Sequence, residues 1–450
     1  MSPTPVSPSA RGGDTLRLVA LLDGEEVGKV FQARNGRLRF VYDEEWRVSA
    51  DGYALSLSLP LAAREHRHDV VSAFLWGLLP DSSRALDNYG RLFGVSPANP
   101  VALLAEIGAD CAGAVQFAPP ERVDALLGAA TLRRSEVDWL DENEIADELR
   151  IVREQGIPGT SRRTVGQFSL AGAQPKIALF EEGGRWGRPT GRTPTNRILK
   201  PPSRDFPGFA ENEHFCLGLA GTLGLGAVQS RVMRFAGEVA IVVDRFDRLK
   251  RRNVYHRVHQ EDFCQALGVM PTRKYENEGG PGLRDIVVIL RDSSQRPEED
   301  VDRFLRAMAL NWVIAATDGH AKNYALLHGP DGATRLAPFY DVASYLPYTH
   351  PSLHRVKLAM KIGSQYLVRR INRRSWEASA RSLSLPEGQL LERVNDLVRR
   401  VAGAVELERE RAIDVGLDAS VIHTLADRIR ARAASCLSAL QPHSSSIPAA

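Results

Sequence analysis

Two acids and an amide in the second half of the chain have the types and spacing of a phosphoryl-transfer site. The segment Asp318-Gly-His-Ala-Lys-Asn323 follows an apolar run, and Asp341 lies at the end of a predicted strand pair. Phosphoryl transfer needs a carboxylate that orients the attacking hydroxyl and accepts its proton, together with oxygen ligands that hold a metal ion against the phosphates. These residues supply such groups in the order typical of kinases. We therefore predict Asp318 as the catalytic base and Asn323 and Asp341 as metal ligands.

The same residues also have a purely structural interpretation. Asp318-Gly319 alone would be expected to end a helix in a turn, and Asp341 alone to cap a strand, because turns concentrate these residue types. The complete arrangement, with an apolar helix before the loop and a strand pair after it, favours the catalytic interpretation.

A lysine ends the short apolar run Arg197–Lys200 in the first half of the chain. In kinases, a lysine at the end of such a strand contacts the α- and β-phosphates of ATP. Glu213, in a predicted helix, is the candidate ion-pair partner of Lys200. Each residue has an ordinary alternative, since strands often end in solvent-exposed Lys and acids are favoured near helix N-termini.

Two further segments have the composition expected of nucleotide contacts. Ser169–Lys176 contains small residues between two strand-like runs, and a hairpin tip there would bring backbone N–H groups against phosphates. It holds one glycine and matches neither GxGxxG nor a Walker A loop, so an ordinary hairpin is the alternative. Val242–Phe246 is an apolar strand that runs into charged residues, and we predict it as a hinge whose backbone pairs with adenine.

Hydrophobic patterning predicts the elements that must position these residues. An antiparallel meander is expected over Thr15–Asp43, with type I′ turns at Asp23-Gly24 and Asn35-Gly36. A further strand is expected over Ala54–Leu59, before Pro60. Apolar residues at helical spacing predict helices over Val70–Leu79 and Val101–Ile107, and Glu121 to Gly156 has an acidic, helical pattern throughout.

Strand patterns return from Gln167 to Phe246, interrupted by a helix over Glu211–Leu223. After Arg248 the pattern is mainly helical. The helix Val301–Ala316 is apolar around most of its circumference and is expected to be buried. A strand pair follows, turned at Gly329–Gly332, and helices are expected to continue to about Leu440.

This layout predicts an α+β, two-lobed, protein-kinase-like fold, with a β-rich N-terminal lobe and a helical C-terminal lobe. The predicted divisions are disordered tails at 1–14 and 443–450, an added N-terminal subdomain at 15–150, an ATP-binding part at 151–248 and a catalytic lobe at 249–442. A length of 450 residues agrees with more than one core, because single cores rarely exceed ~300 residues.

Bulk composition is that of an ordinary soluble globular protein, with 43% hydrophobic and 25% charged residues. The net charge of +3 permits an acidic partner such as ATP or DNA without requiring one. Four scattered cysteines form no CxxC pair, so neither a zinc site nor a disulfide framework is expected. With no signal-peptide pattern and no apolar run near ~20 residues, we expect a cytoplasmic protein.

The motifs together resemble one family, the HipA-type kinase toxins of bacterial toxin–antitoxin systems. The matching stretches occur in family order between about residues 15 and 400; they are LSLSLPL, LLPDS, LLAEIGAD with AGAVQ, SLAGAQPKIAL, ILKPP, NEHFCL, VDRFDR, QEDFCQALG, KYENEGGPG, ATDGHAKN, PFYDVAS and KLAMKIG. A dozen ordered motifs over that length are far more specific than any one of them.

The resemblance implies a protein serine/threonine kinase with ATP and Mg²⁺ as cofactors and Asp318 as the base. Ser169 matches the serine whose autophosphorylation displaces the phosphate-binding loop and switches the kinase off. Pro175 and Asp244 stand where some members have Glu; the first alters loop stiffness and the second should matter little. The residues implied to hold ATP are Ala171, Gly172, Ala173, Gln174, Pro175, Lys176, Lys200, Asp244, Arg245, Phe246, His320, Ala321, Lys322, Asn323, Tyr340 and Asp341.

The resemblance also implies partners. Family members pair with a HipB-like helix-turn-helix antitoxin and reach operator DNA through that complex, and some phosphorylate an aminoacyl-tRNA synthetase, arresting growth and producing persistence. The basic residues Arg369, Arg370, Arg373 and Arg374 lie in the region that is near DNA in the family. An ordinary solvated helix face, balanced by Glu377 and other acids, is an equal alternative for this cluster.

Two other functions remain open from the sequence. One is a kinase of a small-molecule alcohol, because Asp-x4-Asn recurs in such folds, although the first 150 residues match the toxin family instead. The other is a catalytically weak corepressor that only bridges antitoxin and operator DNA. The intact set Lys200, Asp318, Asn323 and Asp341 argues against it.

Overall fold

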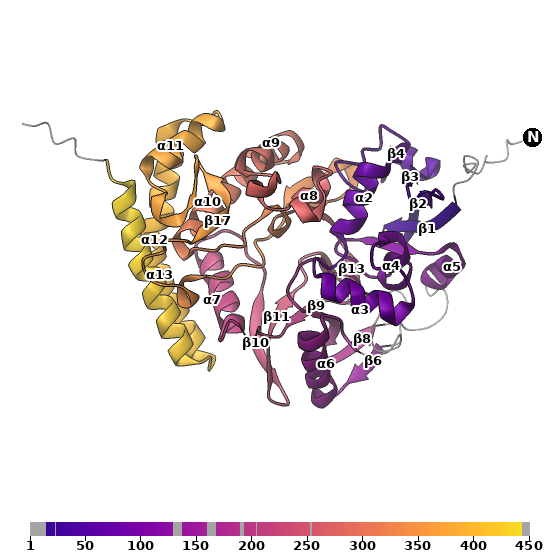
Figure 1. Cartoon of the computed structure of the whole chain (residues 1–450), viewed down its shortest axis with the longest axis horizontal. Coiled ribbons are helices and arrows are strands. Elements are labelled where there is room, and N and C mark those ends of the chain that lie inside the picture. The colour runs from indigo at the N-terminus through magenta and orange to yellow at the C-terminus, as the bar shows by residue number, and fades with distance from the viewer. Residues whose placement is uncertain are drawn as a thin grey trace, which may run out of the picture. The chain divides into compact units, whose positions relative to one another are not determined.

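The computed structural model describes residues 15–22, 24–128, 137–159, 168–189, 193–203, 205–252 and 254–442. The tails predicted at 1–14 and 443–450, and Asp23 of the first predicted turn, lie outside these residues. The chain divides into two compact units (Figure 1). The first consists of Met1–Leu199, Arg245–Thr272 and Leu326–Thr334, and the second of Lys200–Asp244, Arg273–Ala325 and Arg335–Ala450.

The first unit begins with a five-stranded antiparallel sheet in the order β4-β3-β2-β1-β5. The predicted meander is confirmed as β1, β2 and β3, and the later strands β5 and β4 pair with its two edges, at β1 and β3. The strands are β1 (Thr15–Leu22), β2 (Glu25–Gln32), β3 (Leu38–Tyr42), β4 (Glu65–Arg67) and β5 (Val115–Ala118). The helices of this part are α1 (Glu44–Val48), α2 (His68–Gly77), α3 (Ser83–Phe93), α4 (Pro100–Ile107) and α5 (Pro120–Gly128).

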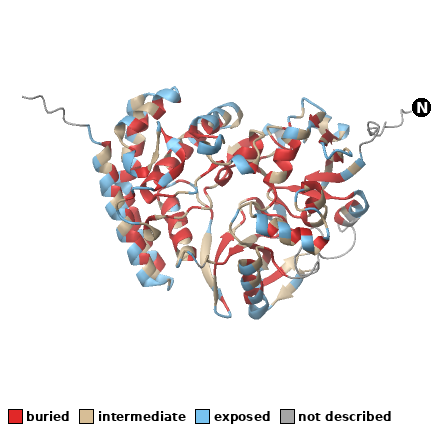
Figure 2. Cartoon of the chain, in the orientation of Figure 1, coloured by how far each residue is buried: buried red, intermediate tan, exposed pale blue. Residues whose placement is uncertain are grey.

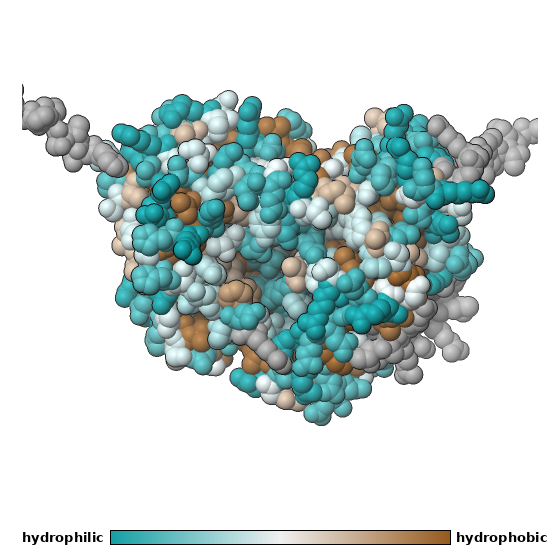
Figure 3. Space-filling model, viewed as in Figure 1, coloured by the Kyte–Doolittle hydropathy of each residue, from teal (hydrophilic) through white to brown (hydrophobic). Residues whose placement is uncertain are grey.

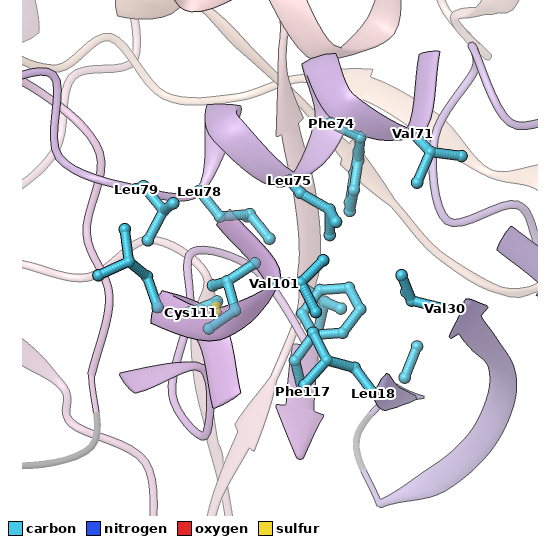
Figure 4. Packing of buried hydrophobic residues seen from close by; sticks show 14 of the residues in the cluster. Leu18, Val30, Val71, Phe74, Leu75, Leu78, Leu79, Val101, Cys111 and Phe117 are labelled. Carbon is cyan, nitrogen blue, oxygen red and sulfur yellow. The ribbon is translucent and has the colours of Figure 1, made fainter. Parts of the chain in front are cut away.

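Apolar residues cover both faces of β1, because successive side chains of a strand point to opposite faces. Leu18, Ala20 and Leu22 join the main core of the unit, to which α2 and α4 contribute Phe74, Leu75 and Val101 (Figure 4). On the other face Val19 and Leu21 pack with Val123 and Leu126 of α5. The helices predicted at Val70–Leu79 and Val101–Ile107 are therefore confirmed as core elements.

Two local predictions in this part of the unit are wrong. The turn at Asn35-Gly36 is not type I′, because Gly36 has a positive φ and Asn35 does not, and Ala33 and Arg37 close a wider loop. Ala54–Leu59 is not a strand: the amide of Leu57 donates to the carboxylate of Glu261 at 2.9 Å, and Ser56 also bonds to Glu261. Long-range hydrogen bonds replace strand pairing in that segment.

A second sheet of this unit pairs four antiparallel strands in the order β6-β8-β7-β9. They are β6 (Val137–Leu140), β8 (Arg185–Pro189), β7 (Ile177–Glu182) and β9 (Arg197–Lys200). The helical pattern predicted from Glu121 to Gly156 is wrong at β6, where Trp139 and Leu140 pair with β8; α6 (Glu142–Gln155) follows it. A capping box at Asp141 begins α6, and Gly156 in the left-handed region ends it.

The mainly helical pattern predicted after Arg248 is wrong for the strands between 248 and 262. Here the first unit contains the hairpin β12 (Arg248–Arg251) and β13 (Val254–Arg257), then β14 (His259–Asp262) and the short α8 (Phe263–Ala266). The predicted strand pair farther along is confirmed as β15 (Ala325–His328) and β16 (Thr334–Leu336), which join β14 in a three-stranded sheet.

The second unit is mainly helical. Among the described residues, its β-structure consists of the hairpin β10 (Ser230–Phe235) and β11 (Glu238–Asp244), the two-stranded sheet β17 (Lys357–Ile362) and β18 (Gln365–Leu367), and the ends of β9, β15 and β16. Its helices are α7 (Phe209–Thr222), α9 (Leu283–Ser293), α10 (Pro297–Ile314), α11 (Arg373–Ser382), α12 (Glu387–Asp414) and α13 (Ala419–Leu440). Helices α12 and α13 bury one side and expose the other (Figure 2).

The central helix α10 is buried as predicted, since every residue from Ala307 to Ile314 is buried. Trp312 packs edge-to-face on Trp376 of α11 and donates its indole N–H to the carbonyl of Val368 at 3.0 Å. Leu390, Val394 and Leu397 of α12 are likewise buried. The helix predicted over Glu211–Leu223 is confirmed as α7.

Candidate active site

The loop that follows α10 carries Asp318, and its conformation is determined locally. Ala315 ends α10 in the left-handed region, and the amide of Ala316 donates to the carbonyl of Asn311 at 2.9 Å. Gly319 is required here, because a Cβ at that position would lie 2.6 Å from Nδ2 of Asn311. The turn then continues into a short 3₁₀ segment, Ala321–Asn323.

Asp318 is presented to solvent, with 67% of its side chain exposed. Its Oδ1 accepts a hydrogen bond of 2.6 Å from the hydroxyl of Tyr275 and lies 3.8 Å from Nε2 of His320. His320 itself is buried. The carboxylate is therefore accessible to a second molecule while its position is held by the protein.

The predicted pair of Lys200 and Glu213 is present in the second unit and includes a third residue. Nζ of Lys200 lies 2.7 Å from Oε1 of Glu213 and 2.7 Å from Oδ1 of Asp341. Lys200 and Glu213 are buried, whereas the Asp341 side chain is 37% exposed. We call Lys200, Glu213 and Asp341 the Lys200 cluster.

The charge of Lys200 is maintained inside the protein. Burial by itself would lower the pKa of Lys200, but the carboxylates of Asp341 and Glu213 outweigh it and raise that pKa above its ordinary value. Lys200 is consequently a fixed positive charge next to an accessible acid.

Asp341 is held in a backbone conformation that non-glycine residues rarely adopt. Its φ is 56°, in the left-handed region. Nδ2 of Asn323 donates to the backbone carbonyl of Asp341 at 3.3 Å, and the hydroxyl of Tyr340 donates to the carbonyl of Lys322 at 2.8 Å. These contacts bring the two predicted metal ligands together, as the sequence suggested. Strained conformations of this kind persist where the surrounding structure enforces them, often at functional sites.

Ser169–Lys176 lies in the first unit and is not the predicted hairpin tip. β7 follows the loop. Before the loop, Phe168 forms an isolated bridge with Asp110, and Gly172 within the loop forms another with Pro80. Nζ of Lys176 donates to the carbonyl of Ala171 at 2.9 Å. The loop takes its shape from pairing with distant segments rather than from a partner strand beside it.

Two features of this loop bear on nucleotide binding and modification. Ala173, Gln174 and Pro175 line a cavity of about 190 Å³ together with other residues of the loop and of the first unit. Ser169 is only 1% exposed, and its hydroxyl donates to the carbonyl of Leu78 at 2.8 Å. A kinase can reach that hydroxyl only after the loop moves.

The predicted hinge, Val242–Phe246, has two of its backbone N–H groups engaged within the protein. The amide of Asp244 donates to the carbonyl of Gln229 at 2.9 Å, and that of Arg245 donates to the carbonyl of Asn196 at 3.1 Å. These two N–H groups are engaged within the protein, so an adenine would have to bond to other backbone groups of the segment.

The side chain of Arg245 belongs to a buried group of charges that the sequence analysis missed. Its guanidinium donates to Asp247 at 2.8 Å and to the carbonyl of Cys111, also at 2.8 Å. Arg248 donates to Asp110 at 2.7 Å. We call this group the Asp110 cluster; its members, all buried, are Asp110, Arg245, Asp247, Arg248 and Arg257. The stretches LLAEIGAD and VDRFDR contain four of them, and this was the available signal.

Electrostatics keep the Asp110 cluster ionised. Burial would raise the pKa of Asp110, but the charges of Arg248, Arg245 and Arg257 hold that pKa well below its ordinary range. Burial and the like charge of Arg245 lower the pKa of Arg248 to about 10. Since all five members are buried, the cluster does not offer an accessible group to a substrate.

The predicted basic cluster lies in a short 3₁₀ segment, Val368–Arg370, and in the first turn of α11. Arg369, Arg370 and Arg374 are exposed. Arg373 pairs with Glu377 at 2.8 Å, which is the acid named in the alternative interpretation. Three arginines therefore present charge to solvent.

Metal-binding clusters and membrane-spanning helices are absent from the described part of the chain. No set of three or more His, Cys, Asp and Glu side chains there is suited to hold a metal ion. None of the helices formed by those residues is both long and apolar enough to cross a membrane. Cys111, Cys216, Cys264 and Cys436 are free and buried.

Comparison with known proteins identifies the family. The HipA-like C-terminal domain matches residues 168–405, which is more than half of the chain, and the HipA N-terminal domain matches residues 18–118. The chain belongs to the HipA family. The N-terminal match covers most of the antiparallel sheet and the helices α1 to α4, and the C-terminal match includes every residue of the Lys200 cluster and the Asp318 loop.

Curated relatives of the HipA family match over nearly the whole chain. Y4mE of Sinorhizobium fredii, named as a candidate kinase, is 37% identical over 91% of this chain and 96% of its own length. The serine/threonine-protein kinase toxin HipA of Shewanella oneidensis is 29% identical over 87% of this chain and 89% of its own length.

A solved HipA structure shows the same fold. It is the Shewanella oneidensis toxin–antitoxin complex of HipA, HipB and operator DNA, with a TM-score of 0.79, 24% identity and coverage of 94% of this chain and 97% of that chain. The predicted α+β, two-lobed, protein-kinase-like fold is confirmed.

Proposed function

We propose that this HipA-family chain is an ATP-dependent protein serine/threonine kinase and the toxin of a toxin–antitoxin pair. The observation that carries the proposal is the second unit's arrangement of Lys200, Glu213 and Asp341 beside the Asp318–Asn323 loop. A buried lysine held by two acids, one of them accessible, is the arrangement that kinases use to grip phosphates and their metal. The named kinase relatives support the same activity.

Each residue has a distinct task in the proposed reaction. The charge of Lys200 binds the α- and β-phosphates of ATP, and Glu213 holds Lys200 in place. Asp318 accepts a hydrogen bond from the serine hydroxyl of the substrate protein and takes its proton as the hydroxyl oxygen attacks the γ-phosphorus. The bond from that phosphorus to the bridging oxygen breaks, and ADP leaves with the negative charge.

The donor atoms fit a magnesium ion. A carboxylate from Asp341 and an amide oxygen from Asn323 are hard oxygen ligands, which Mg²⁺ prefers, usually as one or two protein groups plus phosphates and water. Donation by Nδ2 of Asn323 to the Asp341 carbonyl assigns the amide oxygen as its ligand atom. When bound, the ion neutralises the phosphate charge that develops during transfer.

The remaining ATP contacts are proposed on the family resemblance. Ala171–Lys176 would surround phosphates, and Asp244–Phe246, His320–Lys322 and Tyr340 would complete the nucleotide site. Ser169 is proposed as an autophosphorylation site that requires the loop to leave its buried position. A phosphate there adds nearly two negative charges beside a loop meant for ATP phosphates, so the modified enzyme would be inactive.

The proposed partners are a HipB-like antitoxin, operator DNA reached through that complex, and a protein substrate, with an aminoacyl-tRNA synthetase as the leading class. The HipA–HipB–operator complex of the Shewanella relative supports the antitoxin and the DNA. Arg369, Arg370 and Arg374 are exposed where phosphate contacts would be made.

One experiment tests the activity and separates it from the alternatives. The purified chain is incubated with γ-labelled ATP and Mg²⁺, with a protein lysate in one arm and a panel of alcohols and sugars in the other, and phosphopeptides are mapped. Label in serine of lysate proteins supports the proposal. Label only in small molecules would support a small-molecule kinase, and no transfer at all would leave a corepressor.

The role of Ser169 has its own test. Ser169→Ala should retain or increase phosphorylation of other proteins while losing the main self-phosphorylation signal. Complete loss of activity toward other proteins would instead place Ser169 in the working nucleotide site.

A further inference from the structure

We infer that Tyr275 is a positioning residue for the reaction: its hydroxyl orients the carboxylate of Asp318 and its ring packs on His320. The inference rests on the proposed kinase function. It assigns a task to KYENEGGPG, a stretch that matches the family and that the nucleotide site described above does not use.

Tyr275 contacts the Asp318 loop at two points. Its hydroxyl donates to Oδ1 of Asp318 at 2.6 Å, and its ring lies edge-to-face on His320 with centroids 5.0 Å apart and planes at 82°. The amide of Ala321 also approaches the carbonyl of Lys274 at 3.5 Å. The loop is thus held by Lys274 and Tyr275 as well as by α10.

The surrounding sequence explains how Tyr275 is held. The amides of Glu278 and Gly280 both donate to its carbonyl at 3.0 Å, forming a tight turn around the 3₁₀ segment η2 (Glu276–Glu278). Gly279 has a φ of 84°, and a Cβ on Gly280 would lie 1.9 Å from the carbonyl oxygen of Arg273. The turn therefore requires glycine at both positions, 279 and 280.

A second anchor ties the turn to β17. The carboxylate of Glu276 accepts from the amide of Lys361 at 2.7 Å and pairs with Nζ of Lys361 at 3.0 Å. The residue next to Tyr275 is therefore fixed to a strand. Because its backbone is fixed, the Tyr275 hydroxyl can restrict the orientation of the Asp318 carboxylate, whereas a tyrosine on a mobile loop would move together with its partner.

Asp318 needs such support because two thirds of its side chain is exposed. A carboxylate in that environment that lacked a hydrogen-bond partner would rotate about its side-chain bonds, and each unproductive orientation would lower the fraction of molecules ready to accept the substrate proton. A hydrogen bond from a phenol to a carboxylate is short and strong, and it favours the ionised form that a base requires.

Tyr275→Phe is the direct test, because it keeps the ring on His320 and removes only the hydroxyl. We expect kcat for phosphate transfer to lysate protein to fall about tenfold, the magnitude of one hydrogen bond to a charged group. KM for ATP should stay within about twofold, since the hydroxyl that Tyr275→Phe removes donates to Asp318, the proposed base, and the ring on His320 is kept. Tyr255→Phe, in the first unit, is the matched control and should be unchanged.

The pH profile separates positioning from a general structural effect. A carboxylate without its hydrogen-bond donor is protonated more readily, so the acid limb of the kcat profile should move to higher pH in Tyr275→Phe, by roughly one pH unit at most. Wild-type kcat with an unmoved limb overturns the inference. A faster Tyr275→Phe enzyme also overturns it, because the hydroxyl would then be blocking the base.

A second measurement does not depend on catalysis. The protein is labelled with 3-fluorotyrosine, and the Tyr275 resonance is assigned by its loss in Tyr275→Phe. Asp318→Ala should shift that resonance and leave the other nine tyrosine signals in place. An unshifted resonance refutes the contact. If the unmodified protein transfers no phosphate, the proposed function fails, while this spectrum still decides whether Tyr275 holds Asp318.

Discussion

The Asp110 cluster of the first unit and the Lys200 cluster of the second are both groups of paired charges inside the protein, but they differ in exposure. The Asp110 cluster contains three arginines and two aspartates, all buried, and hydrogen bonds to protein groups surround them. In the Lys200 cluster Asp341 is 37% exposed and has a strained backbone. One group is closed to solvent, and the other has an open side.

The difference indicates which group acts on a ligand. Closed charge networks are expensive to bury and become strongly destabilising when one partner is removed, so their mutation is expected to affect folding. An accessible acid beside a fixed lysine, in a strained conformation, is the kind of arrangement found at functional sites. Residue type and ion pairing alone do not distinguish the two; the exposure of one member does. The face drawn in Figure 3 is mainly hydrophilic on both units, so a hydrophilic surface by itself distinguishes neither unit.

The largest expected effect is that of removing the exposed acid of the Asp318 loop. Asp318→Ala should lower phosphate transfer by about 10²- to 10⁴-fold, because it removes a positioned base. The free energy of unfolding should change by less than about 0.5 kcal/mol, since the side chain is mostly exposed. Initial rates with labelled ATP and urea denaturation measure both. Asp292→Ala, an exposed acid of α9, is the control, and equal rates for the two variants would remove Asp318 from the mechanism.

The closed cluster should give the opposite pattern. Asp110→Ala leaves three buried arginines with one acid and should lower the free energy of unfolding by about 3–5 kcal/mol. Urea denaturation measures the change, with Asp87→Ala, an exposed acid of α3, as the control. A stable Asp110→Ala protein without kinase activity would reverse the comparison and make the cluster part of the site.

The pH dependence of stability should come from His259, a buried histidine of the first unit. Burial and the neighbouring His328 lower the pKa of His259 to about 4, and Glu261 and Asp247 oppose this only in part. The unfolded chain therefore binds more protons between about pH 4 and pH 6.5, and the free energy of unfolding should fall as pH decreases through that window, by up to about 3 kcal/mol.

His259→Gln tests this dependence, because a glutamine amide can still donate to the carbonyl of Leu55, which His259 contacts at 2.8 Å. Urea denaturation at about pH 7 and pH 4.5 should show a smaller difference in the variant than in the parent. Identical differences would assign the pH dependence to other groups.

A smaller effect is expected from the exposed acid of the Lys200 cluster. Asp341→Asn is preferred to Ala, because Asn tolerates the left-handed conformation. Even the removal of a residue that only orients a metal ligand lowers metal affinity by about 10–100-fold, so removal of this carboxylate should weaken Mg²⁺-dependent ATP binding at least about tenfold. Calorimetry of ATP binding with and without Mg²⁺ measures the affinity in both conditions. An equal decrease in both conditions would mean that Asp341 does not act through the metal.

The smallest effect concerns the arginines near α11. Changing Arg369, Arg370, Arg373 and Arg374 to Ala should reduce the salt slope of operator binding by the toxin–antitoxin complex, by about 0.9 for each DNA phosphate that is no longer neutralised. Because Arg373 already pairs with Glu377, we expect up to three such phosphates. Affinity and slope that match the parent across a salt series would assign these residues to plain solvation.

The sequence by itself determined the features that depend on local spacing. Helical periodicity predicted α2, α4, α7 and the buried α10, and β-rich runs separated by Asp-Gly and Asn-Gly predicted the meander, because each pattern lies within one element or one turn. The order of Asp318, Asn323 and Asp341, and the spacing from Lys200 to Glu213, predicted these residues as one group. The structure joins Lys200, Glu213, Asn323 and Asp341 by hydrogen bonds, and Asp318 lies in the same loop as Asn323.

Only the tertiary structure decided the contacts that join distant segments. Asp110 meets Arg245 and Arg248 across more than 130 residues, and Tyr275 meets Asp318 across 43. Ser169–Lys176 was predicted as a hairpin tip and Ala54–Leu59 as a strand, but their polar groups bond to Asp110, Leu78 and Glu261 instead of to a neighbouring strand. Local patterns report how one element buries its apolar face; which polar groups meet depends on how the elements pack, and that information is spread over the whole chain.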